Sequence, residues 1–310
     1  MSNGKNNGRN NAQNPDEPDE GAQGKKARRD AAREKARLQR EAERKRKQRN
    51  RRITQGIVIV AILAVLAVVG VVIFNGVGGA QASAAGPKNM ISDGILLTGN
   101  GKTITATRTA GLKAGEKPVP TDVNAHSKTV NIVTYIDYQC PYCDEFETTN
   151  ETQMMEWVTA GVATLEIHPI AILDSSSDGT DYSTRSANAA ACVANYEPDK
   201  YLAVNKVFYA NQPKEGTTGL TNAKLVSLVK KAGADNAKIP ACINGETFRT
   251  WVGDATSRAL KGPLPNSNVK AVTGTPTVII DGTQYNGSLT SASDFSNAVE
   301  AAYEKKVGSN

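Results

Sequence analysis

The chain has 310 residues and a formal net charge of +6, but this charge is unevenly distributed. Residues 1–52 contain 17 Lys and Arg against 8 Asp and Glu, so they carry +9 and the remaining chain carries −3. The basic pI therefore describes an N-terminal tail and excludes a generally basic folded domain.

Residues 1–24 are mostly Asn, Gly, Gln, Asp and Glu, with almost no apolar side chains, which predicts disorder. Residues 25–50 are rich in Ala, Arg, Lys, Glu and Gln. They could form a charged helix, but a helix that is polar on all sides does not pack into a fold.

Such a basic tract could bind nucleic acid. A membrane-topology signal that also attracts anionic lipid explains the same charges more simply, so we expect no nucleic-acid partner.

Residues 53–74 contain an uncharged apolar run from Ile57 to Phe74, and with its flank this segment is about long enough to span a bilayer. A cleaved signal peptide is the alternative, because Ala80-Gln81-Ala82 resembles a cleavage site. The basic segment before the run is too long for a signal peptide, and so is the run itself, which favours an uncleaved anchor. The Lys and Arg excess places the N-terminus in the cytoplasm and the remaining chain outside. We therefore predict a single-pass cell-membrane protein.

Residues 75–88 are rich in Gly, Ala and Ser and are expected to be a flexible linker to a folded domain over 89–310. Within Ile95–Arg108, β-branched residues around a Gly-Asn-Gly turn predict a β-hairpin. The near-continuous apolar run in Lys128–Asp137 is typical of a central strand. A helix and a further strand are expected next, over Cys143–Ala160 and Val162–Leu173.

The second half of the domain is predicted to be helical before it returns to strands. Helices are expected over Ser183–Asn195, Tyr201–Ala210, Asn222–Lys231 and Glu246–Leu260. Asp281-Gly282, between the strand patterns Val278–Ile280 and Thr283–Tyr285, is a strong hairpin signal. A closing helix follows over Ala292–Lys305, with Ser291 as its N-cap. The element order is therefore β-α-β, a helical block, then β-β-α.

The segment Cys140-Pro141-Tyr142-Cys143 lies at the junction between the central strand and the helix after it. This position puts Cys140 on the first helical turn, where unpaired N–H groups and the positive end of the helix dipole favour a thiolate. Pro141 suits an early helix position because its missing N–H is not needed there. The spacing lets the two sulfurs form a disulfide, so the segment predicts a redox-active pair.

With these motifs in place, the chain resembles the DsbA-type thiol–disulfide oxidoreductases, in which a helical domain interrupts a thioredoxin-like fold. The resemblance rests on residues 137–143, on the helical block, and on Gly274-Thr275-Pro276-Thr277 ahead of a strand, and it covers about residues 120–307. It implies an α/β thioredoxin-like fold with a helical insertion at about residues 178–265. The basic tail and single anchor are similar to those of membrane-anchored actinobacterial relatives.

The resemblance also implies roles for individual residues. Cys140 would be the nucleophile and Cys143 the resolving thiol, while Pro276 would be cis beside them and the Thr275 backbone would pair with substrate. Tyr142 departs from the His of the strongly oxidising members, and it supplies no positive charge at neutral pH.

A second departure concerns acid–base groups near the pair. Thr134 stands where related enzymes place a buried carboxylate. The nearby Asp137 and Asp144 are interpreted as a loop residue and a helix N-terminal acid, and neither is expected to be catalytic.

Cys192 and Cys242 are the two remaining cysteines, and both lie in the predicted helical block. Outside the membrane, the simplest interpretation is a structural disulfide, with two unrelated buried thiols as the alternative. A zinc site with His126 or His168 lacks the paired spacing that such sites show. His126 is interpreted as a surface loop residue and His168 as a packed strand residue. We expect no metal and no cofactor.

Other catalytic patterns fail. The segment Gly99–Thr103 imitates the end of a P-loop, but Leu96 stands where the first Gly is required. No nucleophile-elbow serine motif is present.

Three functions remain. The favoured one is a membrane-tethered oxidase that introduces disulfides into reduced secreted proteins. Its reoxidant would be a quinone-linked membrane oxidase, which the family resemblance alone implies. A reductase or isomerase on the same fold, including one that serves cytochrome assembly, is the first alternative. A thioredoxin-like binding or chaperone module without enzymatic activity is the second.

Overall fold

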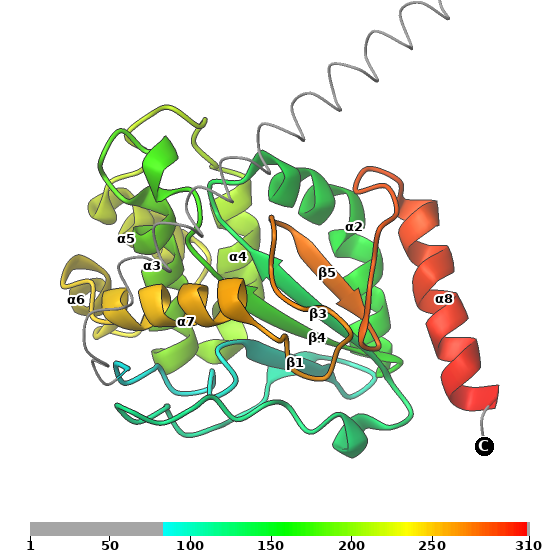
Figure 1. Ribbon diagram of the computed structural model, residues 1–310. Helices are drawn as coiled ribbons and strands as arrows, with labels where there is room; N and C mark the ends of the chain where they lie inside the picture. Colours follow the sequence, from blue (N-terminus) through cyan, green and yellow to red (C-terminus); the bar gives the residue numbers. More distant parts are fainter. Residues whose placement is uncertain (1–82, 309–310) are drawn as a thin grey trace, which may run out of the picture. The chain divides into compact units, whose positions relative to one another are not determined.

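The structure, a computed structural model, describes residues 83–308 (Figure 1). The predicted tail 1–52, the predicted membrane span 53–74 and most of the predicted linker lie outside these residues. Within residues 83–308, no helix is both long and apolar enough to cross a bilayer.

The folded part begins slightly earlier than the sequence predicts. The N–H of Ala84 donates to the Asp254 carboxylate at 2.7 Å, and the N–H of Gly86 donates to the Leu112 carbonyl at 2.8 Å. The end of the predicted linker is therefore attached to the domain, because its backbone groups find partners there.

A six-stranded mixed sheet with strand order β2-β1-β4-β3-β5-β6 forms the centre of the fold. Its strands are β1 (Ile95–Gly99), β2 (Ile104–Ala106), β3 (Val130–Ile136), β4 (Ala163–Pro169), β5 (Thr277–Ile280) and β6 (Thr283–Gln284). Strands β3 and β4 are parallel, as a crossover through a helix requires, and the other pairs are antiparallel. Both predicted hairpins, β1–β2 and β5–β6, are confirmed.

Strand β4 ends at Pro169, four residues before the predicted end at Leu173. The N–H groups of Ile172 and Leu173 do not continue the ladder with β3. They donate instead to the carboxylate of Asp137, at 2.8 and 3.0 Å. The Asp137 side chain, which follows the end of β3, therefore bonds the backbone after β4, and the chain leaves the sheet at this point.

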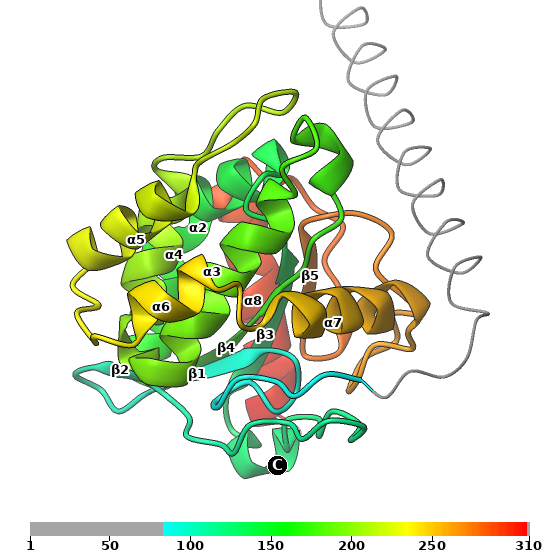
Figure 2. The same cartoon turned by 90° about the vertical axis from the view of Figure 1, so that its left-hand side faces the viewer.

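Five helices, α3 to α7, connect β4 to β5, and two further helices flank the sheet (Figures 1 and 2). The helices are α2 (Pro141–Ala160), α3 (Tyr182–Tyr196), α4 (Tyr201–Tyr209), α5 (Asn222–Lys231), α6 (Ile239–Asn244), α7 (Arg249–Lys261) and α8 (Ala292–Gly308). Helix α6 was not predicted, because six residues are too few for a clear periodicity. Helix α7 begins after the predicted Glu246, whose φ of 46° is not helical.

The two faces of the sheet are covered differently. Figure 1 shows α3 to α6 gathered on the left and α8 on the right. Helices α2 and α8 pack against one face, and Phe146 of α2 meets Phe295 of α8 edge-to-face with ring centres 5.1 Å apart. On the other face, Tyr135 and Ile279 pack in a smaller apolar cluster with Leu260 of α7.

The β5–β6 turn shows how local chemistry sets a hairpin. Asp281 and Gly282 both have positive φ, at 47° and 79°, as a two-residue turn of this kind requires. Helix α8 then begins beside Ser291, whose hydroxyl oxygen accepts the N–H of Asp294 at 3.2 Å. This is the N-cap contact expected from the sequence.

A disulfide joins Cys192 of α3 to Cys242 of α6, with Cα atoms 5.9 Å apart. It therefore links two helices of the block between β4 and β5. Cys140 and Cys143 are both free thiols in this structure.

Replacing both Cys192 and Cys242 by Ala is expected to destabilise the fold by about 4 kcal/mol, because the bridge closes a loop with a sequence separation of 50 residues. The measurement is guanidinium unfolding followed by the fluorescence of Trp157 and Trp251. Alkylation after mild dithiothreitol should label Cys140 first in the wild type. Equal stability of the two proteins would contradict a structural role for the bridge.

Candidate active site

Cys140 occupies the turn between strand β3 and helix α2. It is the N-cap of α2, with extended backbone angles, and Pro141 is the first helical residue. The sequence predicted a position on the first helical turn, and it predicted that the helix begins at Cys143, two residues later than α2 does. The earlier start keeps Cys140 next to the unpaired N–H groups of that turn, and Pro141 has no N–H that would need a partner.

The structure brings Cys140 together with Cys143 and with the segment before β5. The Cys140 thiol donates to the Thr275 carbonyl, with sulfur and oxygen 3.1 Å apart. The Thr275-Pro276 peptide bond is cis. Cys140 is only 4% exposed and Cys143 is fully buried, so Cys140 is the thiol nearer to solvent. Tyr142 is half-buried beside the pair, and Pro141 is exposed.

The two thiols differ in their electrostatic surroundings. Hydrogen bonding from the Cys143 side chain lowers the pKa of Cys140 below its ordinary value against the opposing effect of burial. The Thr275 side chain and the Cys143 backbone N–H lower this pKa further. Burial raises the pKa of Cys143 well above its ordinary value, and the contact with Cys140 adds to this rise. The pair therefore favours a thiolate at Cys140 and a thiol at Cys143.

Asp137 is a buried acid of the site, although the sequence suggested only an ordinary loop residue. It lies in the loop after β3 and is fully buried. Its carboxylate accepts the N–H groups of Gln139, Ile172 and Leu173 at 2.8 to 3.0 Å. Burial still raises the pKa of Asp137 to about 6 against these donors. When Asp137 is ionised, its charge raises the pKa of both redox cysteines.

Glu147 is a second buried acid, on the second turn of α2, and nothing in the sequence singled it out. It is 8% exposed, and burial raises its pKa to about 7, although a hydrogen bond from Asn205 of α4 opposes this. Its neighbours include Tyr138, Tyr201 and Tyr209, whose pKa values burial also raises. A helical pattern gives no sign that this acid lies against the helical block, because the block comes from distant sequence.

Two other residues weighed in the sequence have structural surroundings. Thr134 is fully buried, and its hydroxyl has no hydrogen-bond partner within residues 83–308. Asp144 lies in the first turn of α2, where an acid suits the helix dipole.

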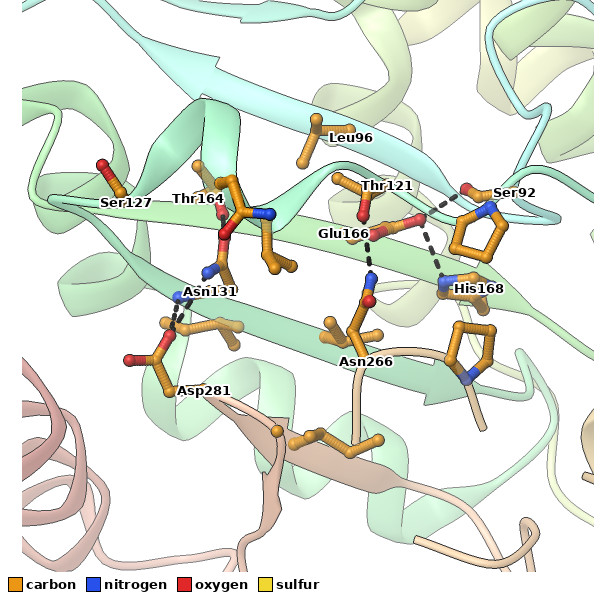
Figure 3. Close-up of a pocket in the computed structure, with 18 of the residues that line it drawn as sticks. Ser92, Leu96, Thr121, Ser127, Asn131, Thr164, Glu166, His168, Asn266 and Asp281 are labelled. Atoms are coloured by element: carbon orange, nitrogen blue, oxygen red, sulfur yellow. Dashed lines mark hydrogen bonds and ion pairs between the residues drawn. The ribbon is translucent and has the colours of Figure 1, made fainter. Parts of the chain in front are cut away.

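The sheet face away from α2 carries a separate cavity of about 420 Å³ (Figure 3). Its wall contains Glu166, which accepts a hydrogen bond from Ser92 and lies 3.2 Å from the ring of His168. His168 also stacks on Tyr135, with ring centres 4.4 Å apart. No residue of 137–143 lines this cavity, and its buried acid is paired within the protein. The cavity is therefore separate from the cysteine pair.

Metal coordination finds no support in the part of the chain that the structure describes. Among residues 83–308, no group of three or more His, Cys, Asp or Glu side chains is arranged to hold a metal ion. His126 lies in a short 3₁₀ helix and His168 in strand β4.

A protein-family model described as thioredoxin matches residues 125–301, more than half of the chain. The chain belongs to the thioredoxin family. The match begins just before β3 and ends within α8, so it includes the redox pair, the helical block and the β5–β6 hairpin. A comparison with curated proteins found no match.

Solved structures similar to this thioredoxin-family chain include several thiol–disulfide oxidoreductases. Oxidised DsbA from Mycobacterium tuberculosis is 24% identical, with 68% of this chain and 92% of that chain covered and a TM-score of 0.50. Reduced DsbG from the same organism is 29% identical, with 58% and 78% covered and a TM-score of 0.48. MdbA from Corynebacterium diphtheriae is 21% identical, with 67% and 93% covered and a TM-score of 0.45. The DsbA match shows that the two proteins share the thioredoxin-like α/β fold.

The raised pKa of Glu147 predicts a pH-dependent stability. Because this pKa is about 7 in the folded protein and 4.5 in the reference state, the folded state holds the proton more tightly between these values. Glu147 therefore reduces stability as pH rises from 4.5 to 7, by up to about 3 kcal/mol. Glu147→Gln should gain stability relative to the wild type over this window, measured by denaturant unfolding at pH 4.5 and 7.5.

The matched control is Glu145→Gln, which removes an exposed acid from the same helix. Its stability difference from the wild type should change little over the same pH range. If Glu147→Gln behaves as this control does, Glu147 does not hold a proton in the folded protein.

Proposed function

We propose that this protein is a membrane-tethered, extracytoplasmic thiol–disulfide oxidoreductase that introduces disulfide bonds into secreted proteins. The observation that carries the proposal is the unequal cysteine pair. Cys140 is next to the helix N-terminus and the Thr275 carbonyl with a lowered pKa, while Cys143 is buried with a raised one. Membership of the thioredoxin family and the names of the similar structures support the same activity.

The chemistry follows from this asymmetry. A substrate thiolate attacks the Cys140 sulfur of the oxidised pair, the Cys140–Cys143 bond breaks, and Cys143 leaves and takes up a proton. A second substrate thiolate then attacks the substrate sulfur of the mixed disulfide. The substrate disulfide forms, and Cys140 leaves as a thiolate, so two electrons pass from the substrate to the pair. The lowered pKa of Cys140 makes it the better leaving group.

The partners and the location extend this proposal. Reduced secreted proteins would be the substrates, and a quinone-linked membrane oxidase would accept the two electrons from the reduced pair. Residues 53–74 would anchor the protein, with the tail 1–52 in the cytoplasm. The Cys192–Cys242 disulfide supports an oxidising compartment, because such bonds are rare in the cytosol.

A reductase or isomerase is the second candidate, and two features of the site favour it. Tyr142 stands where the strongly oxidising relatives have His. The buried charge of Asp137 also raises the pKa of both cysteines, which makes Cys140 a poorer leaving group. The reduction potential separates the candidates, since that of DsbA is about −120 mV and that of thioredoxin is about −270 mV.

Cysteine variants test the mechanism. Cys140→Ser should abolish oxidation of a reduced model protein, because the attacked sulfur is gone. Cys143→Ser cannot form the Cys140–Cys143 disulfide, so it should not oxidise the reduced protein either. Mixed instead with a disulfide-containing substrate, its Cys140 thiolate should attack the substrate disulfide and release one substrate thiolate. The resulting mixed disulfide should accumulate, because Cys143 is not there to displace the substrate from Cys140. Non-reducing electrophoresis and mass spectrometry identify this adduct. The Cys192→Ala/Cys242→Ala double variant, which keeps the redox pair, is the control. Oxidation by Cys140→Ser at the wild-type rate would refute the mechanism, and a potential near that of thioredoxin would move the protein to the reductase class.

The proposed topology has its own test. Protease added to intact cells should digest the domain after residue 88, because that domain is expected outside the membrane. Cells opened with detergent provide the control for protease activity. Survival of the domain in intact cells would contradict the orientation. A mature N-terminus at Ser83 or Ala85 would contradict a retained anchor.

A further inference from the structure

Side chains of the helical block hold the backbone of the turn that carries Cys140. We define this redox loop as residues 137–140, between β3 and α2. Gln212, three residues after α4 ends, donates its side-chain amide to the carbonyl of Tyr138 at 3.1 Å and to the carbonyl of Cys140 at 3.0 Å. The hydroxyl of Tyr209, the last residue of α4, lies 3.5 Å from the carbonyl of Asp137.

The Cys140 carbonyl is also where helix α2 begins. It accepts the N–H of Cys143 at 3.0 Å and the N–H of Asp144 at 3.3 Å. With Gln212, three donors approach an oxygen that has two lone pairs. The Cys143 N–H also lowers the pKa of the Cys140 thiol. The same N–H that bonds the Cys140 carbonyl therefore also acts on the reactive sulfur of that residue.

We propose that Gln212 is a positioning residue of the redox site: by holding the Tyr138 and Cys140 carbonyls, it keeps the turn in the orientation that directs the Cys143 N–H toward the Cys140 sulfur. Gln212 contacts peptide groups and not the sulfur. A donor aimed at the sulfur stabilises the thiolate more than the thiol, so this orientation favours the reactive form. The inference rests on the proposed role of Cys140 as the nucleophile.

The other polar contacts of the redox loop act differently. The Gln139 side chain donates outward to the Ser176 carbonyl at 2.8 Å, and the Asp137 carboxylate accepts from Ile172 and Leu173. These bonds attach side chains of the loop to the segment after β4. Gln212 instead donates from the helical block to the loop's own peptide groups, on both sides of Gln139. It thereby connects the inserted block to the conformation of the redox pair.

The titratable groups that act on Cys140 come from three elements and stay in place when Gln212 is changed. They are Cys143 and Tyr142 on α2, Asp137 after β3, and Tyr209 on α4. Their effects on the Cys140 thiol are therefore common to the wild type and to a neutral variant at position 212. A shift of the Cys140 pKa in such a variant reports the changed hydrogen bonding.

The test uses Gln212→Met in the full chain, in detergent. Met has a similar length and no charge, but it cannot donate. The pKa of Cys140, measured by thiolate absorbance at 240 nm against pH, should rise by about half a unit or more. At a pH below this pKa, the variant should then contain about threefold less thiolate than the wild type. The reduction potential should become more negative in the same variant, since a higher pKa makes the pair less oxidising.

Two further variants keep the test decisive. Gln212→Asn keeps an amide but is one methylene shorter, so it should shift the Cys140 pKa in the same direction even if the Met variant folds poorly. Asn211→Leu is the matched control, because the Asn211 amide donates to the Val207 carbonyl at 2.9 Å and to no atom of the redox loop. The control should leave the Cys140 pKa unchanged. Any effect of this substitution should be confined to the melting temperature.

The outcomes separate this inference from the proposed function. If both folded Gln212 variants keep the wild-type pKa and potential while their melting temperatures fall, Gln212 is merely structural and the inference is wrong. If the wild type itself oxidises no substrate, or if Cys140→Ser remains active, the proposed function fails whatever the Gln212 variants show.

Discussion

The hydrogen bond from the Cys140 thiol to the Thr275 carbonyl joins two segments 135 residues apart, and much of the fold serves to make that contact possible. Strands β3 and β5 are antiparallel neighbours, with Tyr135 opposite Thr277. The end of β3 and the beginning of β5 therefore meet at one edge of the sheet. Because Cys140 follows β3 and Thr275 precedes β5, the register alone brings the redox pair to the cis-proline segment.

The helical block has to leave the sheet after β4 and return before β5 without disturbing this edge. The buried carboxylate of Asp137 accepts hydrogen bonds from Ile172 and Leu173, where the chain leaves the sheet. Gln212 contacts the redox loop from within the block. The disulfide between α3 and α6 fastens the block internally. The block is thus connected to the redox loop by polar contacts with defined donors and acceptors, which fix orientation more strictly than apolar packing does.

The electrostatics of the site combine opposing effects. Hydrogen bonding to its sulfur lowers the pKa of Cys140, while burial and the charge of Asp137 raise it. Asp137 has a pKa of about 6 and Glu147 one of about 7, so both buried acids change charge in the range where disulfide exchange takes place. A cysteine pair with two such acids nearby is expected to respond to pH more strongly than the cysteines alone would.

Much of the fold could be predicted from local sequence. The Asp281-Gly282 hairpin, the strand-to-turn-to-helix context of Cys140 and most of the helices were correct, because each depends on backbone preferences and side-chain periodicity within a few residues. Even the errors were local in effect: α6 was too short to show a pattern, and β4 was predicted to be too long. The proline of the cis segment and the two redox cysteines were likewise visible in the sequence.

What only the tertiary structure decided is which distant groups reach the redox loop. Asp137 is an ordinary acid after a strand until the backbone of residues 172 and 173 folds over it. Glu147 becomes a buried acid because α4 packs against its helix, and Gln212 meets the Cys140 carbonyl across 72 positions of sequence. Sequence alone determined the reactive pair and its local elements, since these depend on neighbouring residues. The burial and hydrogen bonding that set its reactivity depend on long-range packing, which no local pattern encodes.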